Sequence, residues 1–161
     1  MAVPPLAFPL AQLLAGLFNL VLSFLPFGAI LVWFGWQPMP VHLLVVPIVM
    51  LFTAFVFGVG LTLCALNVFF RDIGLLWSAL LPALFYLTPI AYPATLVPER
   101  LRWIAGSNPL YHVIHLVRTV LVEGTLPTTW NWLMAAGLAV TALTIGLLVH
   151  RALRPGYIAN Y

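Results

Sequence analysis

The stretch VHLLVVPIVMLFTAFVFGVGLTLCALNVFFRD, residues 41–72, determines the fold class of this chain. It contains no Asp, Glu, Lys or Arg before Arg71, and none occurs earlier in the chain either. A charged side chain at the centre of a bilayer costs about 2.5–3.5 kcal/mol on insertion scales, so an uncharged apolar stretch of ~20 residues or more is typical of a membrane span. We therefore predict that residues 41–66 cross a membrane.

The composition of the whole chain agrees with this prediction. Of its 161 residues, 64% are hydrophobic and 6% are charged, and the mean hydropathy is +1.14, whereas about 25% of residues in soluble domains are charged. The net charge of +3 comes from dispersed arginines, so the sequence has no basic patch that would bind nucleic acid. We expect a single integral membrane domain, residues 1–161, embedded in the lipid bilayer.

Four apolar segments are predicted as spans, and they cover residues 10–36, 41–66, 73–92 and 130–150. The last segment is the clearest, because its 21 residues would form a helix of roughly 31 Å, close to the thickness of the hydrocarbon core. The first two segments are joined by a short connection and should form an antiparallel hairpin.

Prolines and glycines indicate where these spans bend or approach one another. Pro82 and Pro89 interrupt the third apolar run, and the backbone groups that they leave unbonded must be satisfied by protein or water. Gly58 and Gly60 in the second run would allow a neighbouring helix to come close.

Residues 93–129 do not follow the pattern of a span. Asn108 is typical of a helix N-cap, Pro109 suits the first helical position, and Gly124 suits the C-terminal stop. The helix between them is short for a span and contains Arg118, so we interpret the segment as re-entrant. The predicted fold is an all-α, multi-pass transmembrane bundle with a re-entrant helical hairpin before the last span.

Four short motifs follow one another along the chain: NVFFRD at 67–72, FYLTPIAYP at 85–93, PERLRW at 98–103 and NPLYHVIHLVR at 108–118. The ordered series resembles the permease subunit of ABC-2 type exporters, in the branch that exports lipid-linked O-antigen, capsular polysaccharide or teichoic acid. The resemblance covers nearly the whole chain. It implies transport across the bacterial inner (plasma) membrane.

The resemblance also implies partners and an orientation. In this family a separate ABC ATP-binding subunit supplies the energy, two permease copies form a homodimer, and a lipid-linked glycan is the substrate. The chain has no G-x-x-x-x-G-K-[ST] loop, so ATP hydrolysis is expected in the partner. The family orientation would put both termini in the cytosol. The arginines do not settle this, because three are expected on each side of the membrane.

The chain departs from the family pattern at its N-terminal side. The family's permeases carry about six spans, and we expect this chain to be N-terminally truncated, without the first two spans and the coupling helix that contacts the ATPase. A fragment, a truncated gene and a missing piece supplied elsewhere are the alternatives, and the substrate path should be complete only with those spans. An ABC-2 permease for drugs or lipids and a non-transporting membrane remnant remain open as functions.

Two groups of candidate residues lie outside the apolar runs or at their ends. Asn67, Arg71 and Asp72 would form a loop on the ATPase side, although arginine at a span end is also typical of an interfacial anchor. The second group belongs to the re-entrant region and comprises Pro89, Glu99, Arg102, Asn108, Pro109, His112 and Arg118. Within it, His112, His115 and Arg118 recur every three residues and are expected to share one helix face, where Arg118 could bind a phosphate.

A third group consists of aromatic residues. Phe85, Tyr86 and Tyr92 could line a substrate path, because aromatic faces stack on sugar rings and the resemblance implies aromatic belts along the glycan route. The alternative is lipid-facing packing.

Other chemistries lack the residues that they need. Two histidines at a spacing of three, without a cysteine or carboxylate partner, do not predict a metal site. The chain has three carboxylates with no spaced pair, and neither H-E-x-x-H nor G-x-S-x-G occurs. We therefore expect no cofactor and no enzymatic activity in this chain.

Overall fold

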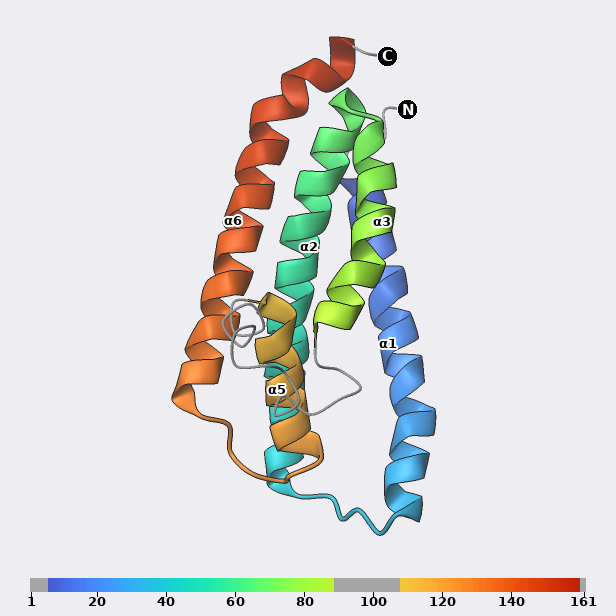
Figure 1. The fold of residues 1–161 in the computed structure, drawn as a ribbon, viewed down its shortest axis with the longest axis vertical. Coiled ribbons are helices and arrows are strands. Elements are labelled where there is room, and N and C mark those ends of the chain that lie inside the picture. Colours follow the sequence, from blue (N-terminus) through green and yellow to red (C-terminus); the bar gives the residue numbers. More distant parts are fainter. Residues whose placement is uncertain (1–5, 89–107, 160–161) are drawn as a thin grey trace.

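A computed structural model describes residues 6–88 and 108–159. Every regular element within these ranges is a helix, as Figure 1 shows. The elements are α1 (Ala7–Trp33), the short 3-10 helix η1 (Pro40–Leu44), α2 (Val45–Phe69), α3 (Asp72–Leu87), α5 (Pro109–Leu121) and α6 (Thr129–Ala159). The predicted all-α, multi-pass membrane bundle is confirmed.

The helices lie roughly along one axis, and the two ends of the bundle differ (Figure 1). At one end, called here the terminal end, α1 begins, α2 turns into α3, and α6 ends. At the other end, called the hairpin end, α1 connects to α2 and α5 connects to α6. α3 starts at the terminal end and stops partway along the bundle, and α5 runs from mid-depth to the hairpin end.

Three helices of the described part are long and apolar enough to cross a membrane: Ala7–Trp33, Pro40–Phe69 and Thr129–Leu153. α3 and α5 are shorter, with 16 and 13 residues or roughly 24 and 20 Å. The run predicted at 73–92 is therefore helical up to Leu87, and its last residues lie outside the described part. The first limb of the predicted re-entrant hairpin lies outside it as well.

α1 ends at Trp33, within the segment predicted at 10–36, because Gly35 has a φ of 81° that other residues rarely adopt. The amide of Trp36 donates to the carbonyl of Leu31 over 3.0 Å, and the amide of Gly35 donates to Val32 over 3.0 Å. These two hydrogen bonds form a Schellman motif, which satisfies the last carbonyls of the helix and reverses the chain toward α2.

The closest helix pair is α2 and α6, which meet at glycines. A Cβ atom placed on Gly58 would collide with the backbone of Ala142 and Leu143, and a Cβ on Gly146 would collide with the backbone of Gly58. On either side of this crossing, small residues such as Ala65 and Ala139 are almost completely buried. Small side chains let helix backbones approach and gain packing contacts, which hold helices together in lipid.

α5 packs against this pair near the hairpin end. Leu116 and Val120 of α5 are fully buried beside Ile48 of α2 and Ala135 of α6, and Trp132 covers their edge. The half-length helix is thus anchored by its own apolar face, and one end of the bundle has a core built from three helices.

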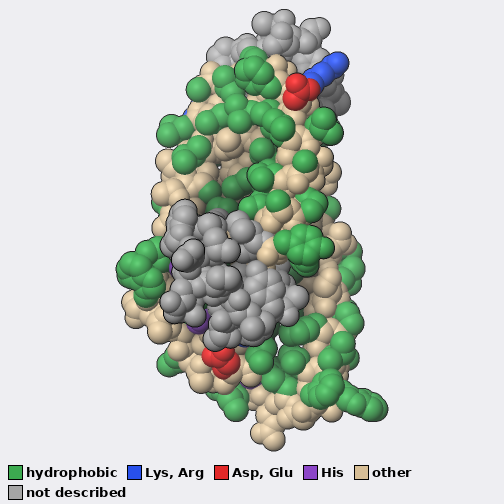
Figure 2. Space-filling view, viewed as in Figure 1, with side chains coloured by type: hydrophobic (Ala, Val, Ile, Leu, Met, Phe, Trp, Pro, Cys, Tyr) green, Lys and Arg blue, Asp and Glu red, His purple; other side chains and the backbone are tan. Residues whose placement is uncertain are grey.

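Much of the remaining surface is apolar, as expected for side chains that face lipid (Figure 2). None of the residues of α1 is buried, and this helix contacts α2 along one side. The predicted close approach at two glycines is confirmed for Gly58 only. A Cβ on Gly60 would meet no atom within 4 Å, because Gly60 points away from α6.

The α2–α6 crossing predicts a sharp difference between two glycine substitutions. Gly58→Ala should lower the free energy of unfolding by at least about 1–3 kcal/mol, because the added methyl group forces the two backbones apart. Gly28→Ala in α1 should be neutral or slightly stabilising, because a Cβ there meets no atom within 4 Å. Unfolding in detergent, followed by tryptophan fluorescence, measures both. Equal stability of the two variants would contradict this packing.

Candidate functional site

The structure describes the side chains of eight predicted site residues: Asn67, Arg71, Asp72, Phe85, Tyr86, Asn108, His112 and Arg118. Pro109 is present as the first residue of α5. Pro89, Tyr92, Glu99 and Arg102 lie outside the described residues.

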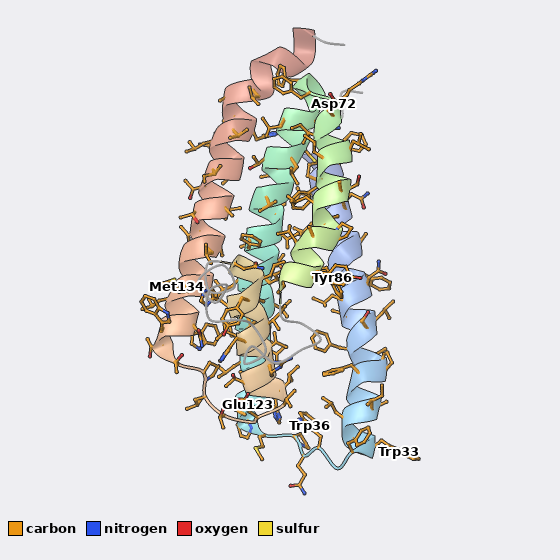
Figure 3. All side chains as sticks on the ribbon, viewed as in Figure 1. Trp33, Trp36, Asp72, Tyr86, Glu123 and Met134 are labelled. Atoms are coloured by element: carbon orange, nitrogen blue, oxygen red, sulfur yellow. The ribbon has the colours of Figure 1, made fainter. Side chains whose placement is uncertain are left out.

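The turn between α2 and α3 forms the polar tip of the terminal end. Asn67 caps this turn, since its Oδ1 accepts a hydrogen bond of 3.1 Å from the amide of Gly74. Arg71 occupies the N-cap position of α3 and Asp72 its first turn, where a carboxylate interacts favourably with the helix dipole. Both charged side chains are exposed, and Figure 3 shows Asp72 near the terminal end of the bundle, where α3 begins. The hydrogen bond between Asn67 and Gly74 holds the turn, so the charged side chains of Arg71 and Asp72 remain exposed at its surface.

The aromatic candidates lie on the last turn of α3, midway along the bundle (Figure 3). The rings of Phe85 and Tyr86 meet edge to face, with centroids 5.7 Å apart and an interplanar angle of 83°. Phe85 is 54% exposed and Tyr86 is 76% exposed. The two rings thus form one aromatic step on the outer side of the described helices, at the depth where α3 stops.

A buried hydrogen-bond network joins the end of α3 to the start of α5. The Nδ2 group of Asn108 donates to Oγ1 of Thr88 over 2.7 Å, and Thr88 in turn donates to the carbonyl of Leu84 over 2.7 Å. The Oδ1 atom of Asn108 accepts from the amide of Leu110 over 2.9 Å, which confirms the predicted N-cap. Thr88 is 1% exposed and Asn108 is 6% exposed.

Sequence reasoning found one half of this network and missed the other. The Asn-Pro pair signals a helix start, but nothing in the sequence indicates that Asn108 also bonds a residue twenty positions earlier. The Thr88–Asn108 hydrogen bond closes the segment between them, so the two ends of residues 88–108 are held together at mid-depth.

The polar residues of α5 do not share one face, and that prediction is wrong. His112 is buried at 6% exposure, whereas His115 is exposed and Arg118 is partly buried. The cause is geometric, since each step of three residues turns an α-helix by about 300° and two steps displace the side chain by roughly 120°. His115 instead faces the start of α6, where its Nδ1 lies 3.2 Å from Nδ2 of Asn131.

A second unpredicted contact ties the hairpin end together. The indole Nε1 of Trp36 donates to the carbonyl of Leu121, the last residue of α5, over 2.9 Å. The same indole stacks on His42 with ring centroids 4.3 Å apart, and Nδ1 of His42 accepts from the amide of Met39 over 2.7 Å. The α1–α2 connection therefore holds the C-terminal end of α5 as well as the start of α2.

No group of three or more His, Cys, Asp and Glu residues that could hold a metal ion occurs in residues 6–88 and 108–159. In Figure 2 an acidic and a basic side chain lie near the terminal end, and one acidic side chain lies in the half toward the hairpin end. The described part therefore combines an exposed charged turn at the terminal end, a largely apolar surface, and a buried polar contact where α3 ends and α5 begins.

Comparison with known proteins agrees with this geometry. Residues 1–122 match the family model of the ABC-2 type transporter. An O-antigen export system permease protein RfbA from Klebsiella pneumoniae is 40% identical over 72 residues, which are 45% of this chain and 28% of that protein. The protein of the same name from Myxococcus xanthus is 29% identical over 143 residues, which are 87% of this chain and 55% of that protein.

The chain is therefore a multi-pass membrane protein of a transport family. It belongs to the ABC-2 type transporter family. It covers between 28% and 55% of the length of these relatives. No solved structure matches the chain significantly.

The Thr88–Asn108 bond can be isolated with a double-mutant cycle. Thr88→Val and Asn108→Ala should each lower stability, and together they should lose less than the sum by about 0.6–1.7 kcal/mol, which is the coupling expected for a hydrogen bond between membrane helices. The matched control pairs Asn108→Ala with Ser78→Ala, because Ser78 bonds within its own helix. Additive losses for Thr88 and Asn108 would show that the bond does not join α3 and α5 in the membrane.

Proposed function

We propose that this chain is the permease subunit of an ATP-driven exporter that moves a lipid-linked polysaccharide across a bacterial inner membrane. The family match and the printed names of the relatives support the class of transporter and of cargo. The single observation that carries the proposal is the break at mid-depth, where α3 stops, α5 starts, and Phe85 and Tyr86 lie exposed beside the junction.

A polar glycan needs such a break, because hydrocarbon offers no partners for its hydroxyl groups. Non-helical backbone at membrane depth is tolerated where it is buried in protein or lines a water-filled cavity. Thr88 and Asn108 are extended where α3 ends and α5 begins, so this junction is a suitable place for a polar route. Exposed aromatic rings can stack on sugar faces one after another. Such stacking holds a sliding polymer loosely, whereas many directed hydrogen bonds would fix it in place.

The proposed exporter needs two partners besides this chain. An ABC ATP-binding subunit supplies the energy and meets the terminal end, where the exposed Arg71 and Asp72 form the polar tip. A second permease copy completes the conduit as a homodimer. α5 runs from Asn108 at mid-depth to the hairpin end, where Trp36 holds its last residue, as expected for one limb of a re-entrant segment.

This proposal fixes the orientation, with the terminal end in the cytosol and the hairpin end outside. In a Cys64→Ala background, Phe70→Cys and Thr125→Cys place one exposed thiol at each end. An impermeant maleimide added to intact cells should label Thr125→Cys and should label Phe70→Cys only after the cells are opened. The reverse pattern would invert the orientation.

The aromatic step is tested by export itself. In cells that lack their own permease and supply the ATP-binding partner, Phe85→Ala combined with Tyr86→Ala should lower surface polysaccharide several-fold, because the stacking surface is lost. Leu75→Ala combined with Leu76→Ala is the matched control, since these aliphatic residues are equally exposed on α3. Membrane insertion and partner binding should be unchanged in both. Normal export by the aromatic double variant would assign these rings to lipid packing.

A further inference from the structure

The connection between α1 and α2 contains a histidine that is part of the contact with α5. His42 lies in η1, and its ring stacks on the indole of Trp36 with centroids 4.3 Å apart and an interplanar angle of 34°. The same indole donates a hydrogen bond of 2.9 Å to the carbonyl of Leu121. The imidazole of His42 therefore supports the indole that holds the last residue of α5.

The ring of His42 is neutral in this arrangement. Its Nδ1 atom accepts a hydrogen bond of 2.7 Å from the amide of Met39. A backbone amide can only donate, so Nδ1 carries no hydrogen and the single ring hydrogen is on Nε2. Protonation would place a hydrogen on Nδ1 and turn this acceptor into a donor. The hydrogen bond to Met39 exists only while His42 is uncharged.

The place of His42 in the helix makes a positive charge unfavourable as well. Met39 is the N-cap of η1, which continues directly into α2, and His42 is the third helical residue, whose side chain reaches back to the cap amide as in a capping box. A positive charge in the first turn of a helix opposes the helix dipole. A charged ring over Trp36 would gain cation–π attraction, but that attraction acts on the indole face and gives the amide of Met39 no acceptor.

Met39 extends the effect of this cap to the turn after α5. A Cβ atom on Gly124 would lie 3.5 Å from Sδ of Met39, so the methionine side chain borders the turn that follows Leu121. His42 thus contacts two residues of the connection, Met39 and Trp36, and each of them contacts the end of α5. Loss of the cap bond weakens both contacts together.

Few other ionisable groups can produce a pH response at this contact. α1 contains none, and α2 contains only Cys64, which lies about six helical turns from His42. The ionisable residues of α5 and of the position just beyond it are Tyr111, His112, His115, Arg118 and Glu123. Guanidinium groups, carboxylates and phenols ordinarily keep their charge state between about pH 5 and 8, whereas histidines change theirs. The test must therefore separate His42 from the two histidines of α5.

We propose that His42 is a pH-sensitive latch for the C-terminal end of α5. In its neutral form it caps η1 and keeps Trp36 bonded to Leu121. In its protonated form the cap bond is lost, the α1–α2 connection moves away, and the end of α5 is released. Because protons bind preferentially to the released state, falling pH favours release. The latch does not rest on the proposed export, so each can fail without the other.

The experiment measures the distance across the latch in the whole chain in nanodiscs. Spin labels are placed on Gln37→Cys and Val122→Cys in a Cys64→Ala background, because both sites are exposed and they flank the bond from Trp36 to Leu121. Pulsed electron spin resonance should give one short distance at a pH of about 8 and a second, longer distance at a pH of about 5. The ratio of the long to the short population should rise about tenfold between these two conditions.

Substitutions of the histidines separate the acceptor from the ring. His42→Gln supplies an acceptor that does not titrate, so only the short distance should appear at either pH. His42→Phe keeps a ring on Trp36 without an acceptor, so the long distance should be populated at both. His115→Gln is the matched control and should respond as the unsubstituted chain does. His42→Asn is the second variant if His42→Gln does not fold, as judged by circular dichroism.

A second pair of labels distinguishes release of α5 from general unfolding. Met50→Cys and Val140→Cys lie on exposed positions of α2 and α6, and their distance should be the same at both pH values. A parallel change in this pair would overturn the latch in favour of unfolding. So would a short distance in His42→Phe at low pH, or an unsubstituted chain that shows one distance throughout. A pH response that survives without His42 would assign the effect to another group.

Discussion

The contact between α2 and α6 at Gly58 is the one on which the other helix positions depend. With no side chain between the two backbones, the helices meet closely enough that a single methyl group would collide. Lipid is as apolar as leucine, so helices in a membrane are held by close packing rather than by transfer from water. The pair formed in this way offers α5 a surface on which Leu116 and Val120 are buried. α5 is held in position because it packs on α2 and α6, whose relative position is set by their own contact.

The position of α5 then determines where the chain can accommodate polar groups. Its first residue lies at mid-depth, where Asn108 bonds Thr88 at the end of α3, and its last residue is held by Trp36 at the hairpin end. A buried polar pair inside a membrane is costly unless every group is satisfied, and here the amide and the hydroxyl each have their partners. The result is a defined interruption of the apolar layer, with Phe85 and Tyr86 exposed next to it. The proposed conduit follows from this interruption.

The sequence predicts the elements better than the contacts between them. The absence of charges before Arg71 predicts apolar spans, and Asn108 with Pro109 predicts the start of α5. Gly35 marks the end of α1. Each of these signals acts within a few residues, so it can be read from the sequence. The contacts depend on which helices become neighbours, which local signals do not contain. Gly58 and Gly60 look alike in the sequence, yet one meets α6 and the other points away from it. The Thr88–Asn108 bond and the Trp36–Leu121 bond join residues far apart in the chain, so no local signal contains them.

The central claim is that a lipid-linked glycan passes the junction of α3 and α5. The most direct measurement replaces Tyr86 with a photocrosslinking amino acid in cells that make the polysaccharide and supply the ATP-binding partner. Tyr86 is 76% exposed, so a crosslinker there reaches whatever lies beside the junction. The account predicts an adduct that carries glycan and that disappears when glycan synthesis is blocked. Adducts with phospholipid alone, unchanged by that block, would contradict it.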